Sequence, residues 1–127
     1  MNKKKVDELL PAAVIILKTV EIANESGIIN KTFRGQISTF GAAIVNGSLL
    51  SAIAFFSDKG SSSVDRPKLI KAIYNLIQPL DTNGNLFDYV KSKGPSKERE
   101  VKEEIINATI AIKLAMNLYT LKGGSDE

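Results

Sequence analysis

Apolar side chains recur every three or four residues through the first segment of the chain, from Lys4 to about Glu25. This is the spacing of one face of an α-helix. Pro11 falls inside the pattern and leaves two alternatives: it is the first-turn residue of a helix that starts near Leu10, or it kinks one longer helix. We expect this element to end at Ser26-Gly27. The apolar positions of its main face are Val6, Leu9, Leu10, Ala13, Ile16, Leu17, Val20 and Ala23.

A run without charged side chains extends from Gly35 to Ser57. A membrane-spanning helix needs about 20 predominantly apolar residues, but Asn46-Gly47-Ser48 interrupts this run. Gly suits the left-handed position just past a helix end, and Ser is a preferred N-cap. The run is therefore predicted to form two short helices joined by a tight corner. The first is capped by Asn30 and buries Phe33, Ile37, Phe40 and Ile44, and the second buries Leu49, Ile53 and Phe56.

Three more helices are predicted in the second half of the chain. Pro67 and Pro79 bound one of them, from about Arg66 to Gln78. A short helix is predicted from about Leu86 to Lys93, and a long one from Lys97 to about Leu121, capped by Ser96. No segment alternates as a strand would. The pattern therefore predicts an all-α fold, a compact bundle of five to six helices with long first and last helices. We expect a single domain over residues 1–127, with flexible ends at about 1–4 and 122–127.

The chain of 127 residues contains no cysteine and no histidine. The protein therefore lacks disulfides, thiolate chemistry, the commonest general base and the commonest zinc ligand. Its basic start, Lys3 to Lys5, is followed by Asp7 and Glu8, where the apolar part of a signal peptide would lie. We expect a cytoplasmic protein.

Two segments carry carboxylates that could hold a metal ion. Asp81–Asn85 alternates oxygen-bearing side chains as a calcium loop does, but the later Gly and bidentate Glu of such a loop are missing, which favours an ordinary turn. Glu100, Glu103 and Glu104 share one helix face, but Lys and Arg are interleaved with them, which favours a salt-bridged surface. We therefore expect no metal site, no cofactor and no catalytic residues, and so a protein that is not an enzyme.

Basic side chains are concentrated in the middle of the chain. The formal net charge is only +3, yet residues 31–80 carry six bases and two acids. This excess is either an even scatter of surface charge or a basic face for a polyanion. In the second case the candidate nucleic-acid-binding residues are Lys31, Arg34, Lys59, Arg66, Lys68 and Lys71.

The block from Phe33 to Lys59, about a fifth of the chain, resembles the signature region of the small helical subunit of the type III-B CRISPR effector (Cmr) complex. Members of that family carry an aromatic-Arg pair that starts a helix, then an apolar helix and an Asn-Gly-Leu-like corner. A short Ala-rich helix follows, ending in Phe and a basic residue. The similar segments here are Phe33-Arg34, Ile37 to Val45, Asn46 to Leu49 and Ala52 to Lys59.

This resemblance implies a non-catalytic subunit that acts in antiviral defence. Several copies would stack along the crRNA and its target RNA, beside other Cmr subunits, and basic side chains would contact the RNA backbone without reading its sequence. The resemblance covers or borders Lys31, Arg34 and Lys59, whereas Arg66, Lys68 and Lys71 are candidates from charge alone. It implies no membrane partner and no small-molecule substrate.

Three other hypotheses stay open. The chain could be the small subunit of a type III-A complex. It could instead be a helical protein-interaction module without nucleic acid, in which the basic excess serves only solubility. A carboxylate-based metal enzyme is the third, and it requires Glu100, Glu103 or Glu104 to bind a divalent cation.

Overall fold

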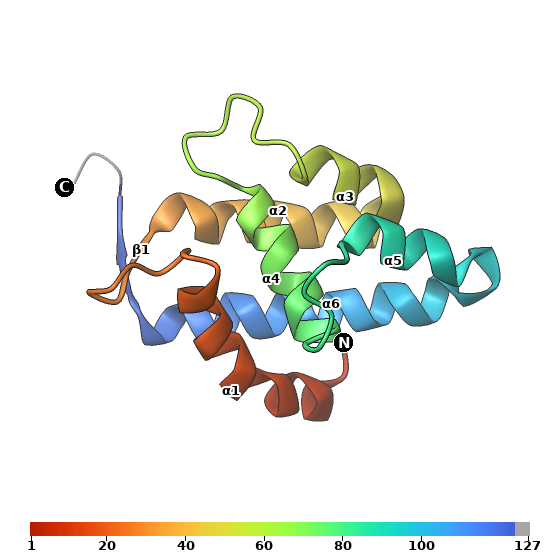
Figure 1. Cartoon of the computed structure of the whole chain (residues 1–127), viewed down its shortest axis with the longest axis horizontal. Coiled ribbons are helices and arrows are strands. Elements are labelled where there is room, and N and C mark those ends of the chain that lie inside the picture. The colour runs from red at the N-terminus through yellow and green to blue at the C-terminus, as the bar shows by residue number, and fades with distance from the viewer. Residues whose placement is uncertain (124–127) are drawn as a thin grey trace.

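The computed structural model describes residues 1–123, over which six α-helices pack around a hydrophobic core (Figure 1). The longest helix, α6, contacts α1, α2, α4 and α5 and so lies at the centre of the bundle. This confirms the predicted all-α bundle with long first and last helices. The helices are α1 (Lys3–Thr19), α2 (Lys31–Asn46), α3 (Leu49–Phe56), α4 (Pro67–Ile77), α5 (Leu86–Lys93) and α6 (Glu98–Ala115). Shorter elements are the 3-10 turns η1 (Pro95–Lys97) and η2 (Met116–Leu118) and the strands β1 (Ile28–Asn30) and β2 (Thr120–Lys122).

Local signals place α2 and α3 as predicted. Asn30 caps α2 by accepting a hydrogen bond from the Thr32 backbone N–H at 2.9 Å, and Ser48 caps α3. Gly47 has a φ of −139°, so the predicted left-handed backbone at the corner is wrong. Glycine is favoured there by space instead, because a Cβ would lie 3.0 Å from the Ala43 carbonyl oxygen.

The uncharged run from Gly35 to Ser57 forms part of the core. One side of α2 and α3 is buried, as predicted, whereas Val45, Leu50 and Phe55 remain exposed on the other side. No helix among residues 1–123 is long and apolar enough to cross a bilayer. Farther along, α4 and α5 match their predicted limits to within one residue.

The first helix differs from its prediction at its C-terminal end. Pro11 lies inside α1, so the alternative of one longer helix is correct. The helix ends at Thr19 rather than at Ser26-Gly27, because the N–H groups of Glu21 and Ile22 bond back to the last-turn carbonyls of Lys18 and Leu17, both at 3.0 Å. Glu21 has a φ of +62°, in the left-handed region that glycine usually occupies at such helix ends. Because this residue is a glutamate and not a glycine, the sequence carries no signal that the helix ends here.

A short parallel sheet was not predicted. Ile28 pairs with Thr120, and Asn30 pairs with Lys122. The helix α6 ends at Ala115, and the chain then turns so that β2 lies beside β1. The predicted helix to about Leu121 is therefore wrong. Each strand has three residues, which is too short to show alternation of apolar and polar positions.

The N-terminal segment contacts α6. Asn2 caps α1, and its own N–H donates a hydrogen bond to the buried Asn107 Oδ1 at 2.9 Å. The Met1 amino group lies 3.0 Å from the Glu103 carboxylate. Of the predicted flexible C-terminal end, Lys122 lies in β2, and residues 124–127 lie outside the described residues.

The predicted cap of the last helix is also wrong. Ser96 lies within η1, and α6 begins at Glu98 without a side-chain cap. The Gly94-Pro95 break instead produces a 3-10 turn that leads directly into the helix.

Candidate nucleic-acid interface

Lys31 and Arg34 lie on the first turn of α2, where the Asn30 cap and the β1–β2 pair hold the start of the helix. Residues three apart on a helix are neighbours, so these two cations share one edge of it. The Arg34 Nη1 atom donates a hydrogen bond to Asn117 Oδ1 at 2.6 Å. The neighbouring Nε atom is buried and has no hydrogen-bond partner among residues 1–123, and a ligand outside the protein cannot reach it.

The environment of Arg34 is suited to an additional acceptor. A guanidinium has five N–H donors and cannot lose its charge. The neutral side chain of Asn117 orients the group without cancelling that charge. The N-terminal end of α2 adds the positive end of its helix dipole. A phosphate oxygen is the kind of acceptor that such a site attracts.

Lys59 and Arg66 belong to the connection between α3 and α4, and their environments differ. Arg66 is half-buried and turned onto the end of α3: its Nε donates to the Asp58 carbonyl at 2.6 Å, and its Nη2 donates to the Phe55 carbonyl at 3.1 Å. The Arg66 Cζ atom also lies 4.3 Å from the centre of the Phe55 ring. Lys59 is exposed. Arg66 therefore supports the fold, whereas Lys59 is available to a ligand.

The connection carrying Lys59 is tied to α2 by one side-chain contact. Gln36 Nε2 donates to Ser62 Oγ at 3.3 Å. Ser62 also accepts a hydrogen bond from the Val64 N–H, and Val64 is buried in the core. Lys59 is thus part of a connection that is anchored to the same helix as Lys31 and Arg34.

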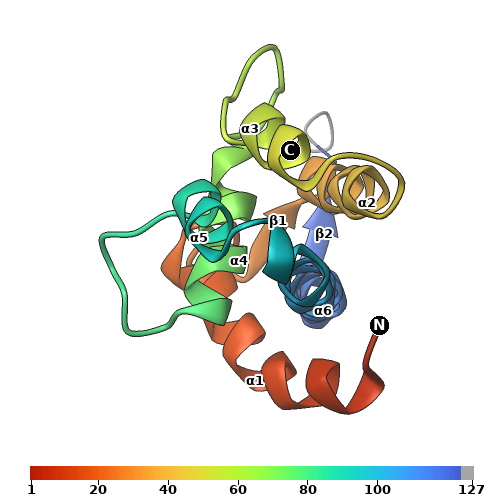
Figure 2. The same ribbon diagram turned by 90° about the vertical axis from the view of Figure 1, so that its right-hand side faces the viewer.

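Lys68 and Lys71 lie on α4, which sits on a different side of the bundle from α2 (Figure 2). The Lys68 Nζ atom donates to the Glu21 carbonyl at 3.2 Å, and Lys71 is exposed. Both line a hollow of about 330 Å³ together with Glu21 and Asp65. The six candidates therefore lie on three parts of the fold, α2, the α3–α4 connection and α4, and α2 and α4 are on different sides of the bundle.

Five of the six candidate cations have no close carboxylate within residues 1–123. In this range, no ion pair involves Arg34, Lys59, Arg66, Lys68 or Lys71. Asp58 and Asp65, the two acids nearest in sequence, likewise form no ion pair with another described residue. These five side chains thus keep their positive charge within the described part of the chain.

The predicted acidic clusters have other partners. Glu103 pairs with the Met1 amino group, Glu100 lies 3.7 Å from Lys97 Nζ, and Glu104 accepts a hydrogen bond from the Tyr89 hydroxyl at 2.6 Å. Burial and this hydrogen bond raise the pKa of Tyr89 to about 12, so its hydroxyl remains a donor. No group of three or more His, Cys, Asp or Glu side chains within residues 1–123 could hold a metal ion.

Asp81 belongs to the ordinary turn that was expected. Its carboxylate accepts hydrogen bonds from the Tyr74 hydroxyl and from the N–H groups of Asn83 and Gly84. These donors, the tyrosine above all, lower the pKa of Asp81. Asn85 caps α5 by accepting a hydrogen bond from the Asp88 N–H.

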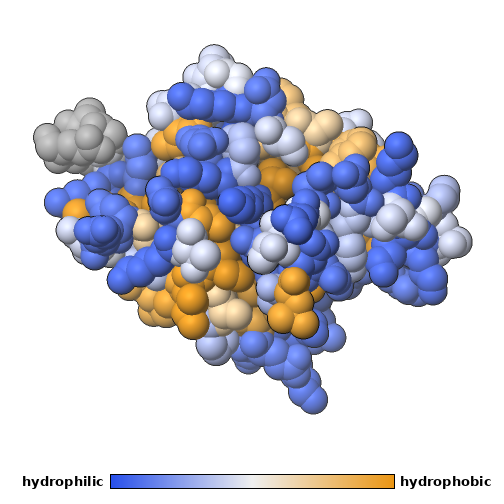
Figure 3. All heavy atoms as spheres, viewed as in Figure 1, coloured by the Kyte–Doolittle hydropathy of each residue, from blue (hydrophilic) through white to orange (hydrophobic). Residues whose placement is uncertain are grey.

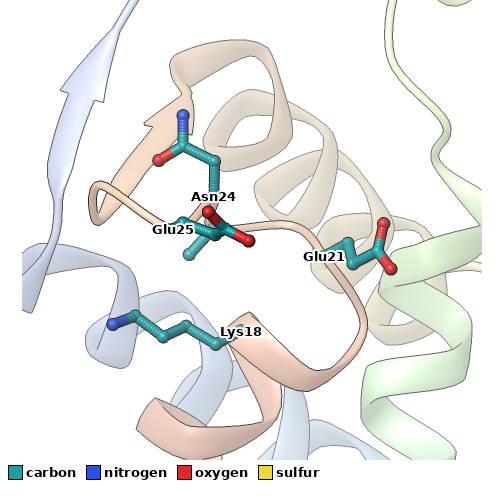
Figure 4. Close-up of a pocket in the computed structure, with 5 residues that line it drawn as sticks. Lys18, Glu21, Asn24 and Glu25 are labelled. Carbon is teal, nitrogen blue, oxygen red and sulfur yellow. The ribbon is translucent and has the colours of Figure 1, made fainter.

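A hollow of about 470 Å³ beside the end of α1 brings together Lys18, Glu21, Asn24 and Glu25 (Figure 4). The Lys18 and Glu21 side chains point away from each other, and the Asn24 amide points away from both. A single ligand atom cannot reach all these polar groups. The hollow therefore lacks the convergent geometry of a catalytic site.

Asn117 was missed by the sequence analysis. It lies 83 positions from Arg34 in the chain, and its approach depends on the unpredicted turn after α6. No local pattern could have indicated it.

Comparison of the whole chain with protein-family models, with curated proteins and with solved structures gave no match.

Proposed function

We propose that this chain is a non-catalytic small subunit of a type III-B CRISPR effector complex, located in the cytoplasm. In this proposal several copies stack along the crRNA and its target RNA, in contact with other Cmr subunits, and supply backbone contacts for antiviral defence. The observation that carries the proposal is the Arg34 guanidinium at the start of a helix, which is oriented by a neutral asparagine and has no carboxylate partner among residues 1–123. Its place in the Phe33 to Lys59 block, where the resemblance lies, adds support.

The proposed RNA face consists of Lys31, Arg34 and Lys59. All three lie on α2 or on the connection tied to it, and their exposed or half-buried heads suit contact with phosphate. Arg66 and Lys68 direct their donors to backbone carbonyls, so we give them a secondary place. Lys71 lies on the α4 side, away from this face.

Contacts with neighbouring subunits also have a basis in the surface. Val45, Leu50 and Phe55 are large, apolar and exposed, and Phe55 is 61% accessible. Apolar residues of this kind become buried when copies or other subunits pack together. Leu50 also lines a hollow of about 280 Å³ beside Val90 and Pro95.

RNA titration tests the proposed face. Fluorescence anisotropy with a labelled single-stranded RNA should show sequence-independent binding that weakens with salt. The double variant Arg34→Gln and Lys59→Gln should lower the slope of log K against log salt by about 1.4, because each lost phosphate contact on a single strand removes about 0.7. Lys4→Gln with Arg99→Gln removes the same charge elsewhere and should leave the slope nearly unchanged.

Equal slopes for both double variants would exclude Arg34 and Lys59 from RNA contact. Native mass spectrometry on tagged protein purified from its own host tests the assembly itself. A ribonucleoprotein with a short RNA, backbone subunits and several copies of this chain supports the proposal. A complex with type III-A backbone subunits, or an RNA-free pair with one protein, contradicts it.

A further inference from the structure

The loop between α4 and α5 carries an Asn-Gly pair, Asn83-Gly84, on an exposed segment. All residues from 79 to 85 are exposed. The loop projects from the body of the molecule in Figure 2, and it lies on the face shown in Figure 3, where hydrophilic residues predominate. An asparagine followed by glycine cyclises readily, because no Cβ on the second residue hinders attack by its backbone nitrogen on the asparagine side chain. The structure thus presents a reactive pair on a segment with little packing.

We propose that Asn83 is a site of spontaneous covalent modification, at which its side chain condenses with the Gly84 nitrogen, and that the Asp81 carboxylate restrains this reaction. The Gly84 nitrogen attacks Asn83 Cγ, and the new N–Cγ bond replaces the Cγ–Nδ2 bond. The backbone amide proton leaves with the side-chain nitrogen as ammonia. Water then adds to either carbonyl of the resulting succinimide ring, which gives aspartate or isoaspartate at this position.

The fold requires the glycine that makes this pair reactive. A Cβ at position 84 would collide with the Tyr74 hydroxyl and the Asp81 carboxylate. Tyr74 is buried, and its hydroxyl donates a hydrogen bond to Asp81 Oδ2. The close approach of the chain to the Tyr74–Asp81 pair therefore places a glycine directly after Asn83.

The Asp81 carboxylate holds the atom that must attack. Its Oδ1 accepts hydrogen bonds from the Asn83 N–H at 3.1 Å and from the Gly84 N–H at 3.0 Å. Cyclisation requires the Gly84 nitrogen to turn toward Asn83 Cγ and to lose its proton. The hydrogen bond opposes this turn, and the adjacent negative charge disfavours loss of the proton. Opening of the turn away from Asp81 is therefore the step that controls the reaction.

The second Asn-Gly pair of the chain, at Asn46, has a different environment. Asn46 is also exposed, but it is the last residue of α2, and Ile44 and Leu49 on either side of the pair are buried. Rotation of the backbone at Asn46 would move α3 relative to α2 and expose these side chains. The exposed loop around Asn83 opens with less disturbance of the core. The same dipeptide should therefore react faster at Asn83.

Modification would change the turn itself. Isoaspartate adds a methylene group to the main chain and a carboxylate beside Asp81, which shifts both N–H groups that Asp81 accepts. We expect this to loosen the Tyr74–Asp81 contact and to lower the melting temperature. The inference does not depend on the proposed RNA contacts, because the loop joins α4 to α5 and contains none of Lys31, Arg34 and Lys59.

Peptide mapping by mass spectrometry of the full chain, incubated at mildly alkaline pH, tests this inference. In the folded protein we expect Asn83 to lose ammonia about tenfold faster than Asn46, or more, and in urea the two sites should react at similar rates. A methyltransferase specific for isoaspartate should label the Asn83 peptide. Asp81→Ala should raise the folded-state rate about tenfold, because it releases the Gly84 N–H from a charged acceptor.

Asp58→Ala is the matched control, because it removes an exposed carboxylate outside the loop and should leave the rate unchanged. Thermal melting verifies that the variants fold, and an unchanged rate at Asn46 shows that the effect of Asp81→Ala is local. Equal rates at Asn83 and Asn46 in the folded protein, or no modification at Asn83, would overturn the inference. A rate that is unchanged or lower in Asp81→Ala would overturn the restraint assigned to Asp81.

Discussion

The surroundings of Arg34 and Arg66 differ, although both side chains are half-buried and both lie in the basic middle of the chain. Arg66 directs two donors to carbonyl oxygens at the end of α3 and stacks over Phe55. Arg34 has one acceptor among residues 1–123, the neutral Asn117, and its buried Nε is unpaired there. Charge counting treats these residues alike, but their acceptors indicate opposite roles: one stabilises a connection and the other is suited to a ligand.

The largest effect is expected from Arg66→Ala. The change removes two charge-assisted hydrogen bonds and a cation–π contact, and we expect a loss of about 2 kcal/mol in the free energy of unfolding. Urea denaturation measures it, and RNA affinity should stay within about twofold of wild type at a temperature where the variant is folded. Arg99→Ala is the control, because Arg99 is the remaining arginine and is exposed on α6. Equal stability of the two variants would remove the structural role assigned to Arg66.

Arg34→Gln should show the reverse pattern. We expect about tenfold weaker RNA binding, since a charge-assisted contact contributes about 1.5 kcal/mol. The stability change should be small, because the substitution removes a single side-chain hydrogen bond, to the exposed Asn117. Arg99→Gln supplies the same charge change for comparison in the anisotropy titration. A loss of stability with unchanged RNA affinity would make Arg34 a second structural arginine.

The contrast between the arginines also defines what could be predicted from the sequence. The helices and the Asn30 and Ser48 caps depend on neighbours in the chain, so periodicity and capping residues indicated them. The parallel strand pair joins residues at opposite ends of the sequence, and its three-residue strands carry no period. The six basic candidates followed from composition, and the resemblance covers or borders three of them. Their division into carbonyl-bound and available cations depends on tertiary contacts, which no local pattern encodes.

A third cation, Lys68, also donates to a backbone carbonyl, because its Nζ bonds to the carbonyl oxygen of Glu21. Glu21→Gly should stabilise the protein by about 0.5–1 kcal/mol, because it relieves a left-handed conformation that costs a residue with a side chain about 1 kcal/mol. The carbonyl that accepts from Lys68 is retained. Glu25→Gly makes the same charge change where φ is not positive, and it should not stabilise. Thermal melting of both variants decides the matter, and equal shifts would indicate a charge effect instead.

The smallest effect is expected at Asn117, which we assign to positioning Arg34 rather than to contact with RNA. Asn117→Ala should weaken RNA binding by about threefold, because a guanidinium without its acceptor samples more orientations and a lost hydrogen bond costs about 0.5–1 kcal/mol. Asn117→Asp sharpens the test, since a carboxylate would pair with Arg34 and compete with phosphate. Its RNA affinity should fall below that of the alanine variant, while its unfolding free energy should equal or exceed that of wild type. If Arg34 served only the fold, the aspartate would stabilise the protein and leave RNA binding unchanged, so the two readouts together separate orientation for a ligand from support of the fold.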